Sequence, residues 1–337
     1  MRALKSLVAA LLSAVIATAA RKPLEIYFVD VEGGQATLFV APAGQSLLID
    51  TGWDNNANRD AIRITKAMKL AGIKRIDYVL ITHYHKDHVG GVPQLAAKAR
   101  LGTFIDHGVN REQSPATQHL YEEYQKAIAG KSHLEVKPGD RLPIRGIEAT
   151  VVSADGGVIS DPLPGAGGQN AECSGVQEHA TDTTENARSV GTVLTFGSLR
   201  IVDLGDLTWN KELELMCPVN KLGNADVLIV SHHGYDSSNS PALVHGLHPR
   251  AAVIDNGATK GADPSAWDII KSAPGSADIW QLHFADAGGS EHNASDPFIA
   301  NTRGADTGFY IKLSAHEDGS FEIYNARNKF SKSYPAK

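Results

Sequence analysis

The segment that most restricts how this chain can fold is ITHYHKDHVGG, at residues 81–91. It places three histidines and an aspartate within six positions, directly after an apolar run that is typical of a buried strand. Because alternate side chains of an extended segment share a face, His83 and His85 are expected to point the same way. Asp87 and His88 follow as the chain turns. Imidazole and carboxylate groups together suit Zn²⁺ and its neighbours, so we expect this loop to supply ligands to two adjacent metal ions.

Short apolar strands alternate with amphipathic helices on both sides of this cluster. In the first half we predict strands at 24–31, 36–42, 46–52, 75–83 and 101–108, and helices at 58–72, 90–100 and 114–131. In the second half we predict a hairpin at 189–206, strands at 225–234, 251–257 and 278–284, helices at 208–217, 240–249 and 263–273, and a final hairpin around Asp318 and Gly319. Strands followed by helices, twice over, predict an α/β fold in which two β-sheets pack together with helices outside.

Residues 1–20 differ from the rest of the chain. Arg2 and Lys5 begin this stretch with positive charge, an apolar run follows, and small residues stand at its end. The run is short for a membrane anchor, so we interpret it as a secretory signal peptide. The mature chain, 21–337, is then expected to be a single domain in the periplasm or outside the cell, with no membrane span.

Removal of the leader makes the mature chain more acidic. Without Arg2 and Lys5 the basic residues fall from 32 to 30 against 38 acidic residues, so the net charge changes from −6 to −8. General nucleic-acid binding needs clustered Lys and Arg side chains to contact phosphates, and the sequence has no such cluster. We therefore expect a small-molecule or ester substrate rather than strong general nucleic-acid binding.

One long segment, residues 154–188, interrupts the alternation because it is rich in Gly, Asp, Ser and Pro and poor in apolar residues. A loop of this length inside a domain is usually functional or disordered. A flap over an active site and a flexible insert without such a role are equally compatible with the sequence. The two cysteines, Cys173 in this insert and Cys217 beyond it, lie outside apolar strands. In an oxidising compartment this placement favours one disulfide over two unrelated thiols.

The segment THYHKDH, followed by VGG, resembles the signature of the metallo-β-lactamase superfamily. Three further segments, LLIDTG at 47–52, IVDLGDL at 201–207 and VLIVSHHG at 227–234, occur in the order of that family. The resemblance extends from about Leu24 to about Leu313. It implies an αββα sandwich of two mixed β-sheets flanked by helices, the metallo-β-lactamase fold.

The subgroup is indicated by VDVEGGQATLF near the start of the mature chain and by SHHG near its end. Together they are similar to the hydrolase domain of ComEC-type DNA-uptake proteins and of related secreted hydrolases, including phosphorylcholine esterases. The channel-forming membrane helices of the uptake proteins have no counterpart in this sequence.

The resemblance implies a role for individual residues. Asp206 is expected to be a carboxylate that bridges two metals, and Asp50 a catalytic-site residue that orients a metal ligand. Asp87 is expected to bind metal and to help orient the nucleophile. One of His232 and His233 should bind metal and the other contact substrate, and the sequence leaves the choice open. The implied metal ligands are His83, His85, Asp87, His88, Asp206, His232 and His233.

One position departs from the family pattern. Many members carry another metal-binding histidine before the Gly-Asp motif, whereas Asn186 stands there in this chain, as it does in the ComEC-type subgroup. His107 follows a predicted strand and is a candidate substitute, the alternative being a partly buried polar residue at a loop. His283 is a third candidate. The alternative is that His283 is a core histidine at the end of a strand.

These expectations combine into a secreted hydrolase that holds two Zn²⁺ ions, or Mn²⁺ in their place, and uses a metal-bound hydroxide as nucleophile. The expected substrate is a phosphodiester or another ester. One alternative is a β-lactam or lactone hydrolase. The other is a non-catalytic metal-binding or DNA-uptake accessory protein, which a complete ligand set argues against.

Overall fold

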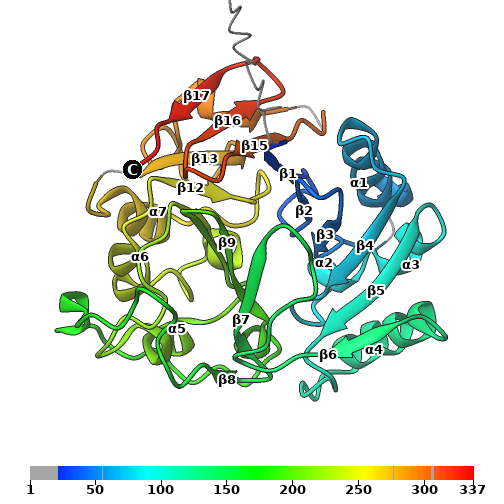
Figure 1. Ribbon diagram of the computed structural model, residues 1–337, viewed down its shortest axis with the longest axis horizontal. Helices are drawn as coiled ribbons and strands as arrows, with labels where there is room; N and C mark the ends of the chain where they lie inside the picture. The colour runs from blue at the N-terminus through cyan, green and yellow to red at the C-terminus, as the bar shows by residue number, and fades with distance from the viewer. Residues whose placement is uncertain (1–21, 55, 276, 305–306) are drawn as a thin grey trace, which may run out of the picture.

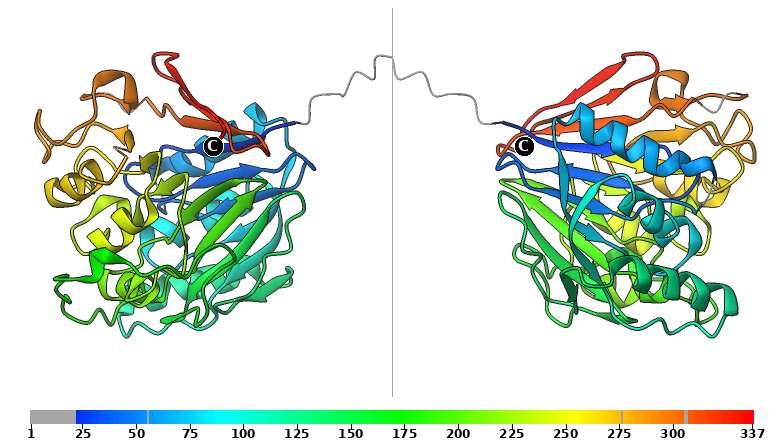
Figure 2. Two further views of the ribbon diagram at one scale, coloured as in Figure 1. Left: turned by 60° about the vertical axis from the view of Figure 1, so that its left-hand side comes forward. Right: turned by 90° about the vertical axis from the view of Figure 1, so that its right-hand side faces the viewer.

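Two β-sheets face each other in the computed structural model, which describes residues 22–337 except 55, 276 and 305–306 (Figure 1). The predicted signal peptide lies outside the described residues. Each sheet combines parallel and antiparallel neighbours, and helices cover the outer faces (Figure 2). The predicted αββα sandwich is therefore confirmed.

The first sheet consists mainly of strands from the first half of the chain, joined by three antiparallel strands from the C-terminal end. Of the described residues, it contains nine strands in the order β17 (Ser331–Tyr334), β16 (Phe321–Asn325), β15 (Ile311–Ala315), β1 (Leu24–Phe28), β2 (Thr37–Val40), β3 (Ser46–Ile49), β4 (Arg75–Leu80), β5 (Arg100–Asp106) and β6 (His133–Glu135). Strands β3 to β6 are parallel to one another.

The second sheet is built from the remaining strands. Within the described part of the chain it contains eight, in the order β14 (Ile299–Asn301), β13 (Asp278–His283), β12 (Ala251–Ile254), β11 (Val227–Ile229), β10 (Leu199–Asp203), β9 (Gly191–Phe196), β7 (Glu148–Ala154) and β8 (Gly157–Val158). Strands β10 to β14 are parallel, and β9 pairs antiparallel with β10 as the predicted hairpin.

Helices lie on both outer faces of the sandwich (Figure 2). The α-helices of the described residues are α1 (Arg59–Leu70), α2 (Lys86–Val89), α3 (Val92–Ala96), α4 (Pro115–Ile128), α5 (Trp209–Met216), α6 (Pro241–Leu247) and α7 (Pro264–Lys271). Short 3-10 turns occur at η1 (Asn56–Asn58), η2 (Ala171–Cys173), η3 (Asn186–Arg188), η4 (Ser231–Gly234) and η5 (Asp296–Phe298). Ser114 is the N-cap residue of α4, because its side chain accepts a hydrogen bond from the Thr117 amide.

Three apolar clusters hold these layers together. The central one lies between the sheets and includes Phe39, Leu80, Ile201 and Trp280 from both. The second joins the outer face of the second sheet to α5, α6 and α7, and the third joins the first sheet to α1, α3 and α4. Burial of these faces drives the sheets together, since apolar surface removed from water stabilises the fold by about 25 cal/mol per Å².

Some strands end earlier than predicted, and other strands were not predicted at all. The strand predicted at 75–83 ends at Leu80, and the one predicted at 225–234 spans only β11, so the histidines lie in the loops that follow. Strands β6, β8, β14 and β17 were not predicted, because each has only two to four residues and lies at the edge of its sheet. Strand β7 was also missed, although it has seven residues and is largely buried.

The insert at 154–188 is irregular over most of its length and is attached to the second sheet. Cys173 forms a disulfide with Cys217 at the end of α5, the pairing that the sequence favoured. The indole Nε1 of Trp209 donates to the Gln177 carbonyl at 3.0 Å, and the Trp209 ring stacks on His179 with centroids 4.2 Å apart. The insert therefore packs on α5, and its last residues lead into β9.

Candidate metal centre and active site

Asp50 and the predicted metal ligands follow strands that run parallel to a neighbour. Asp50 follows β3, the histidine cluster follows β4, Asp206 follows β10, and His232 and His233 follow β11. Parallel strands present their carboxyl ends at one edge of a sheet, which is where α/β proteins place their sites. The two sheets bring these ends together, so residues far apart in the sequence form one cluster.

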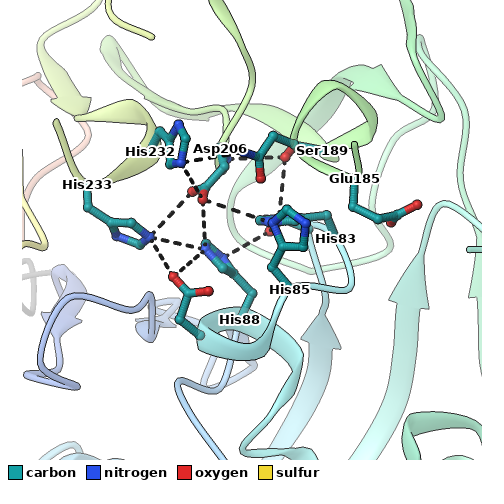
Figure 3. Close-up of polar contacts among 12 residues, drawn as sticks. His83, His85, His88, Glu185, Ser189, Asp206, His232 and His233 are labelled. Atoms are coloured by element: carbon teal, nitrogen blue, oxygen red, sulfur yellow. Dashed lines mark hydrogen bonds and ion pairs between the residues drawn. The ribbon is translucent and has the colours of Figure 1, made fainter. Parts of the chain in front are cut away.

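Four buried side chains form the centre of this cluster: Asp87, His88, Asp206 and His233, called the quartet below. One ligand atom from each lies within 4.8 Å of all the others. His88 Nε2 lies 3.1 Å from Asp206 Oδ2 (Figure 3). His233 Nε2 lies 3.1 Å from Asp87 Oδ2. Two carboxylates and two imidazoles at this spacing match the ligand types that Zn²⁺ and similar cations prefer.

Each quartet histidine contacts a buried carboxylate through Nδ1, the ring nitrogen that faces away from the other quartet residues. Nδ1 of His88 donates to Asp50 Oδ2 at 2.6 Å, and Nδ1 of His233 donates to Asp255 Oδ1 at 3.2 Å. These contacts fix the rings, as carboxylates behind metal-binding histidines commonly do. Asp50 therefore has the orienting position that was predicted for it. Asp255 was missed, although it follows β12 and so occupies a strand end like the other site residues.

The two Nε2 atoms of His88 and His233 face each other 3.2 Å apart. Because each ring donates its Nδ1 proton to a carboxylate, each Nε2 presents a lone pair to the other. Two facing lone pairs repel unless a positive charge, either a proton or a metal ion, lies between them. A proton between the rings supplies this charge in the ion-free chain, and the residues of the quartet also fit a divalent metal in its place.

His83 and Asp206 carry further buried atoms without a partner. Nε2 of His83 accepts no hydrogen bond and lies 3.8 Å from Asp206 Oδ2, and Oδ1 of Asp206 also lacks a hydrogen-bond partner. Thr82 and Ser189 contact the opposite nitrogen of His83, at 3.0 and 3.4 Å, and so orient the ring. Buried polar atoms are normally satisfied, so these orphaned atoms indicate a second point at which an ion fits.

His85 lies beside this point but is engaged elsewhere. Its ring packs edge-on against His83 with centroids 4.7 Å apart, while its Nε2 contacts Glu112 Oε2 at 2.9 Å. The segment after Leu80 is no longer a regular strand, so alternation alone does not place both rings on one face. Glu112 was missed by the sequence reasoning, since it lies in a loop without any distinguishing pattern.

Of the two adjacent histidines, His233 belongs to the quartet. His232 Nε2 lies 3.5 Å from Asp206 Oδ2, and its Nδ1 lies 3.1 Å from Ser237 Oγ. Both residues adopt left-handed backbone conformations, with φ of 52° and 53°. Such conformations are costly for non-glycine residues and concentrate at functional sites. The turn sends the rings to different sides of Asp206 (Figure 3).

The three additional candidates lie at different distances from the quartet. Asn186 Nδ2 is 3.5 Å from His232 Nε2, and Asn186 Oδ1 is buried without a hydrogen-bond partner. His107 Nε2 instead contacts the buried Glu185 at 2.8 Å. His283 Nε2 contacts Asp30 at 2.7 Å, in a separate group with Glu32. The structure therefore brings Asn186 to the edge of the site and pairs the other two with carboxylates elsewhere.

The glycines of the VGG segment allow the metal loop to pack closely on the loop after β3. A Cβ on Gly91 would lie 2.1 Å from the Thr51 carbonyl oxygen, a distance that real side chains do not reach. The Thr51 amide in turn donates to the His88 carbonyl at 2.8 Å. This contact holds the loop that carries Asp50 against the loop that carries His88.

The electrostatics of the quartet favour a bound cation. Burial disfavours the charged form of Asp206, but the positive charge of His88 outweighs it and holds the pKa well below the usual range. Burial likewise opposes ionisation of Asp87, but His88 and Lys260 hold its pKa well below the usual range. Burial and the nearby His88 lower the pKa of His83 well below its usual value. The neighbouring carboxylates outweigh burial and raise the pKa of His88 well above its usual value and that of His233 to about 9. Asp87, Asp206 and the neutral His83 therefore have the protonation states that metal ligands need, whereas an ion at the facing rings would have to displace a proton.

Comparison with known proteins identifies the family. A model of the metallo-beta-lactamase superfamily matches residues 29–244, more than half of the chain. The chain belongs to the metallo-β-lactamase superfamily. It is a hydrolase of this superfamily with a candidate metal site, as the sequence motifs predicted.

Two relatives and one solved structure are similar to this chain. ComE operon protein 3 of Bacillus subtilis (strain 168) is 24% identical over 247 residues, which are 69% of this chain and 28% of that protein. Hydroxyacylglutathione hydrolase of Rhodopseudomonas palustris (strain HaA2) is 30% identical over 97 residues, 29% of this chain and 31% of that protein. The crystal structure of the metallo-beta-lactamase fold protein YhfI from Bacillus subtilis has a TM-score of 0.46 at 14% identity, covering 77% of this chain and 96% of that one.

The first of these similarities agrees with the predicted resemblance to the ComEC-type subgroup. The chain spans less than a third of the length of either relative. The helices of the described residues offer no segment that could span a bilayer.

Replacing Asp50 with asparagine should weaken metal binding even though Asp50 is not a ligand. Asp50 accepts hydrogen bonds from the amide and hydroxyl of Thr82, at 2.8 and 2.7 Å, besides the one from His88. An amide has one acceptor atom fewer and no charge to hold the ring. We expect a loss of metal affinity of about 10- to 100-fold, measured by competition with a chelating dye.

The matched control is Asp77→Asn, because Asp77 accepts from the amide and hydroxyl of Ser46 in the same way but lies on β4. This variant should keep the metal affinity of the unmodified chain. Equal affinities for Asp50→Asn and the unmodified chain would show that Asp50 does not orient the site.

Proposed function

We propose that this chain is a secreted hydrolase that acts on a phosphodiester or another ester with a divalent cation held by the quartet. The observation that carries the proposal is the pair of Nε2 atoms, on His88 and His233, that face each other 3.2 Å apart between two ionised carboxylates. When bound, the cation would act as a Lewis acid and lower the pKa of a coordinated water toward neutrality.

The protein side chains supply orientation and charge. Asp50 and Asp255 fix the two quartet rings, and Asp206 lies between the ends of the two sheets, in reach of His83 and His232 as well. This central position supports a bridging role for Asp206. The unsatisfied Nε2 of His83 supports a second ion, which would gain His85 as a ligand if that ring left Glu112.

The donor types support zinc as the metal, with Mn²⁺ as the alternative. Imidazole nitrogen suits Zn²⁺ and its transition-metal neighbours, whereas Ca²⁺ and Mg²⁺ prefer oxygen ligands alone. A non-catalytic metal-binding role is less well supported, because the quartet is complete and its histidines are oriented.

The export part of the proposal is supported by the leader-like residues 1–20 and by the Cys173–Cys217 disulfide, since disulfides persist mainly in oxidising compartments. Fractionation of the source cells followed by N-terminal sequencing tests it. Protein that begins near residue 21 in the periplasm or medium supports export, and full-length protein in the cytosol contradicts it.

A substrate screen of the metal-replete mature chain tests the activity. The substrates are bis-p-nitrophenyl phosphate, p-nitrophenyl phosphorylcholine, nitrocefin and a lactone. We expect the phosphate esters to be hydrolysed fastest. Turnover of nitrocefin or the lactone alone would favour the alternative enzyme, and full metal content without any turnover would favour a non-catalytic protein.

A further inference from the structure

A lysine that no family motif contains lies against the quartet. Lys260 stands in the loop after β12, and its ammonium group forms an ion pair with Oδ2 of Asp87. The same nitrogen donates to the Gly33 carbonyl at 2.5 Å. It also lies over two aromatic rings, 5.1 Å from the centroid of Trp53 and 5.9 Å from that of Tyr235.

These contacts hold the ammonium at the site independently of Asp87. The Gly257 amide donates to the Lys260 carbonyl at 2.9 Å, which closes the loop at the base of the side chain. A carbonyl oxygen and two aromatic faces remain as partners when one contact is lost, and aromatic faces attract cations. The side chain is 22% exposed, so solvent and small molecules reach it.

A metal ion and this ammonium compete for the same carboxylate oxygen. Asp87 Oδ2 also faces His233 Nε2 at 3.1 Å, so it is one of the oxygens that the quartet offers to a cation. A divalent ion held by that oxygen would repel the ammonium and weaken its ion pair. Lys260 would then keep the Gly33 carbonyl and the two aromatic faces but lose its anionic partner, which leaves a donor for an anion beside the ion.

We propose that Lys260 binds an anionic oxygen of the substrate, and that the substrate is therefore a negatively charged phosphodiester rather than a neutral ester or lactone. This inference rests on the proposed hydrolysis at the quartet and narrows its substrate class. The positive charge of Lys260 would add to that of a bound cation. The site would therefore attract an anionic substrate, whereas a neutral ester would gain no electrostatic attraction from Lys260. Trp53 and Tyr235 flank the ammonium and restrict the directions from which a substrate oxygen can approach.

The test compares three variants: Lys260→Met, Lys260→Arg and Lys312→Met. Lys312 is a matched control, because it is 24% exposed, forms an ion pair with Glu25 at 2.5 Å and lies 5.4 Å from the Tyr27 centroid, all on β1 and β15. Calorimetry measures the binding of inorganic phosphate and of acetate to the metal-replete proteins. Dye competition measures the metal affinity of the metal-free proteins. Kinetics compare bis-p-nitrophenyl phosphate with neutral p-nitrophenyl acetate.

We expect Lys260→Met to weaken phosphate binding, and to raise KM for the phosphodiester, by about tenfold or more, because a charged hydrogen bond is lost. Lys260→Arg should retain most of the affinity, and Lys312→Met all of it. Metal affinity of Lys260→Met should stay equal or increase, since a competitor for Asp87 is gone. The effect of Lys260→Met on the neutral ester should be smaller than its effect on the phosphodiester. Stronger loss for acetate than for phosphate would indicate a carboxylate-bearing substrate and overturn the phosphodiester assignment.

Other outcomes separate this inference from the proposed function. Unchanged phosphate binding in Lys260→Met, equal losses on the charged and neutral esters, or reduced metal affinity in that variant would each overturn the role of Lys260. A chain that hydrolyses no ester, but loses phosphate affinity in Lys260→Met, would overturn the proposed function and leave the anion site standing.

Discussion

Asp206→Asn is expected to lose metal binding and hydrolysis together. Asp206 is the residue on which the contacts of the site converge, with His88, His232, His233 and His83 at 3.1, 3.5, 3.6 and 3.8 Å from its carboxylate oxygens. An amide carries no charge to offset a cation and binds metal poorly. We expect turnover to fall by about a hundredfold or more, since activation of the nucleophile depends on the ion.

A purely structural role for Asp206 predicts a different result. A carboxylate at a helix start can be replaced by asparagine at little cost. However, α5 begins at Trp209 with Thr208 as its N-cap residue, so Asp206 does not occupy the capping position. Elemental analysis and turnover of the folded variant distinguish the two roles. Full metal content with near-normal turnover would remove Asp206 from the site.

Asp226→Asn is the matched control for this variant. Asp226 is buried to the same extent as Asp206, but it accepts from the Arg200 amide and contacts Arg250 at the other end of the sheet. Loss of these contacts should lower the free energy of unfolding and leave the metal content unchanged. A loss of metal in both variants would mean that the effect reflects general destabilisation.

Chelation should abolish hydrolysis, and Zn²⁺ or Mn²⁺ should restore it. Both cysteines are in the disulfide, so no thiol of the described residues can replace an ion-activated nucleophile. The melting temperature should fall as well, since an ion that binds only the folded chain stabilises it. Turnover that survives exhaustive chelation would contradict a metal-dependent mechanism.

The sequence predicted most of the site because its residues follow apolar strands. Parallel strands bring their carboxyl ends to one edge, so His88, Asp206 and His233 could be expected to meet despite their separation along the chain. The choice between His232 and His233 could not be made in advance. It depends on two consecutive left-handed residues, which no spacing in SHHG reveals.

Other residues were beyond sequence reasoning for physical reasons. Lys260 and Glu112 lie in loops, and their position depends on how those loops pack on the site rather than on any periodic pattern. His107 and His283 were reasonable candidates as strand-end histidines, but a buried carboxylate lies beside each of them, at Glu185 and Asp30. Strands such as β6 and β8 were missed because they contain three and two residues and carry little apolar pattern.

The metal content of the purified chain tests the central claim most directly. The mature protein is loaded with Zn²⁺, freed of excess metal by gel filtration and analysed by elemental mass spectrometry, with a His88→Ala/His233→Ala double variant beside it. We predict about one to two transition-metal ions per chain, because the quartet provides one complete ligand set and the unsatisfied Nε2 of His83 indicates a second metal position. The double variant should lose most of its bound metal. A chain that retains no metal after loading, or a double variant that retains all of it, would contradict this account.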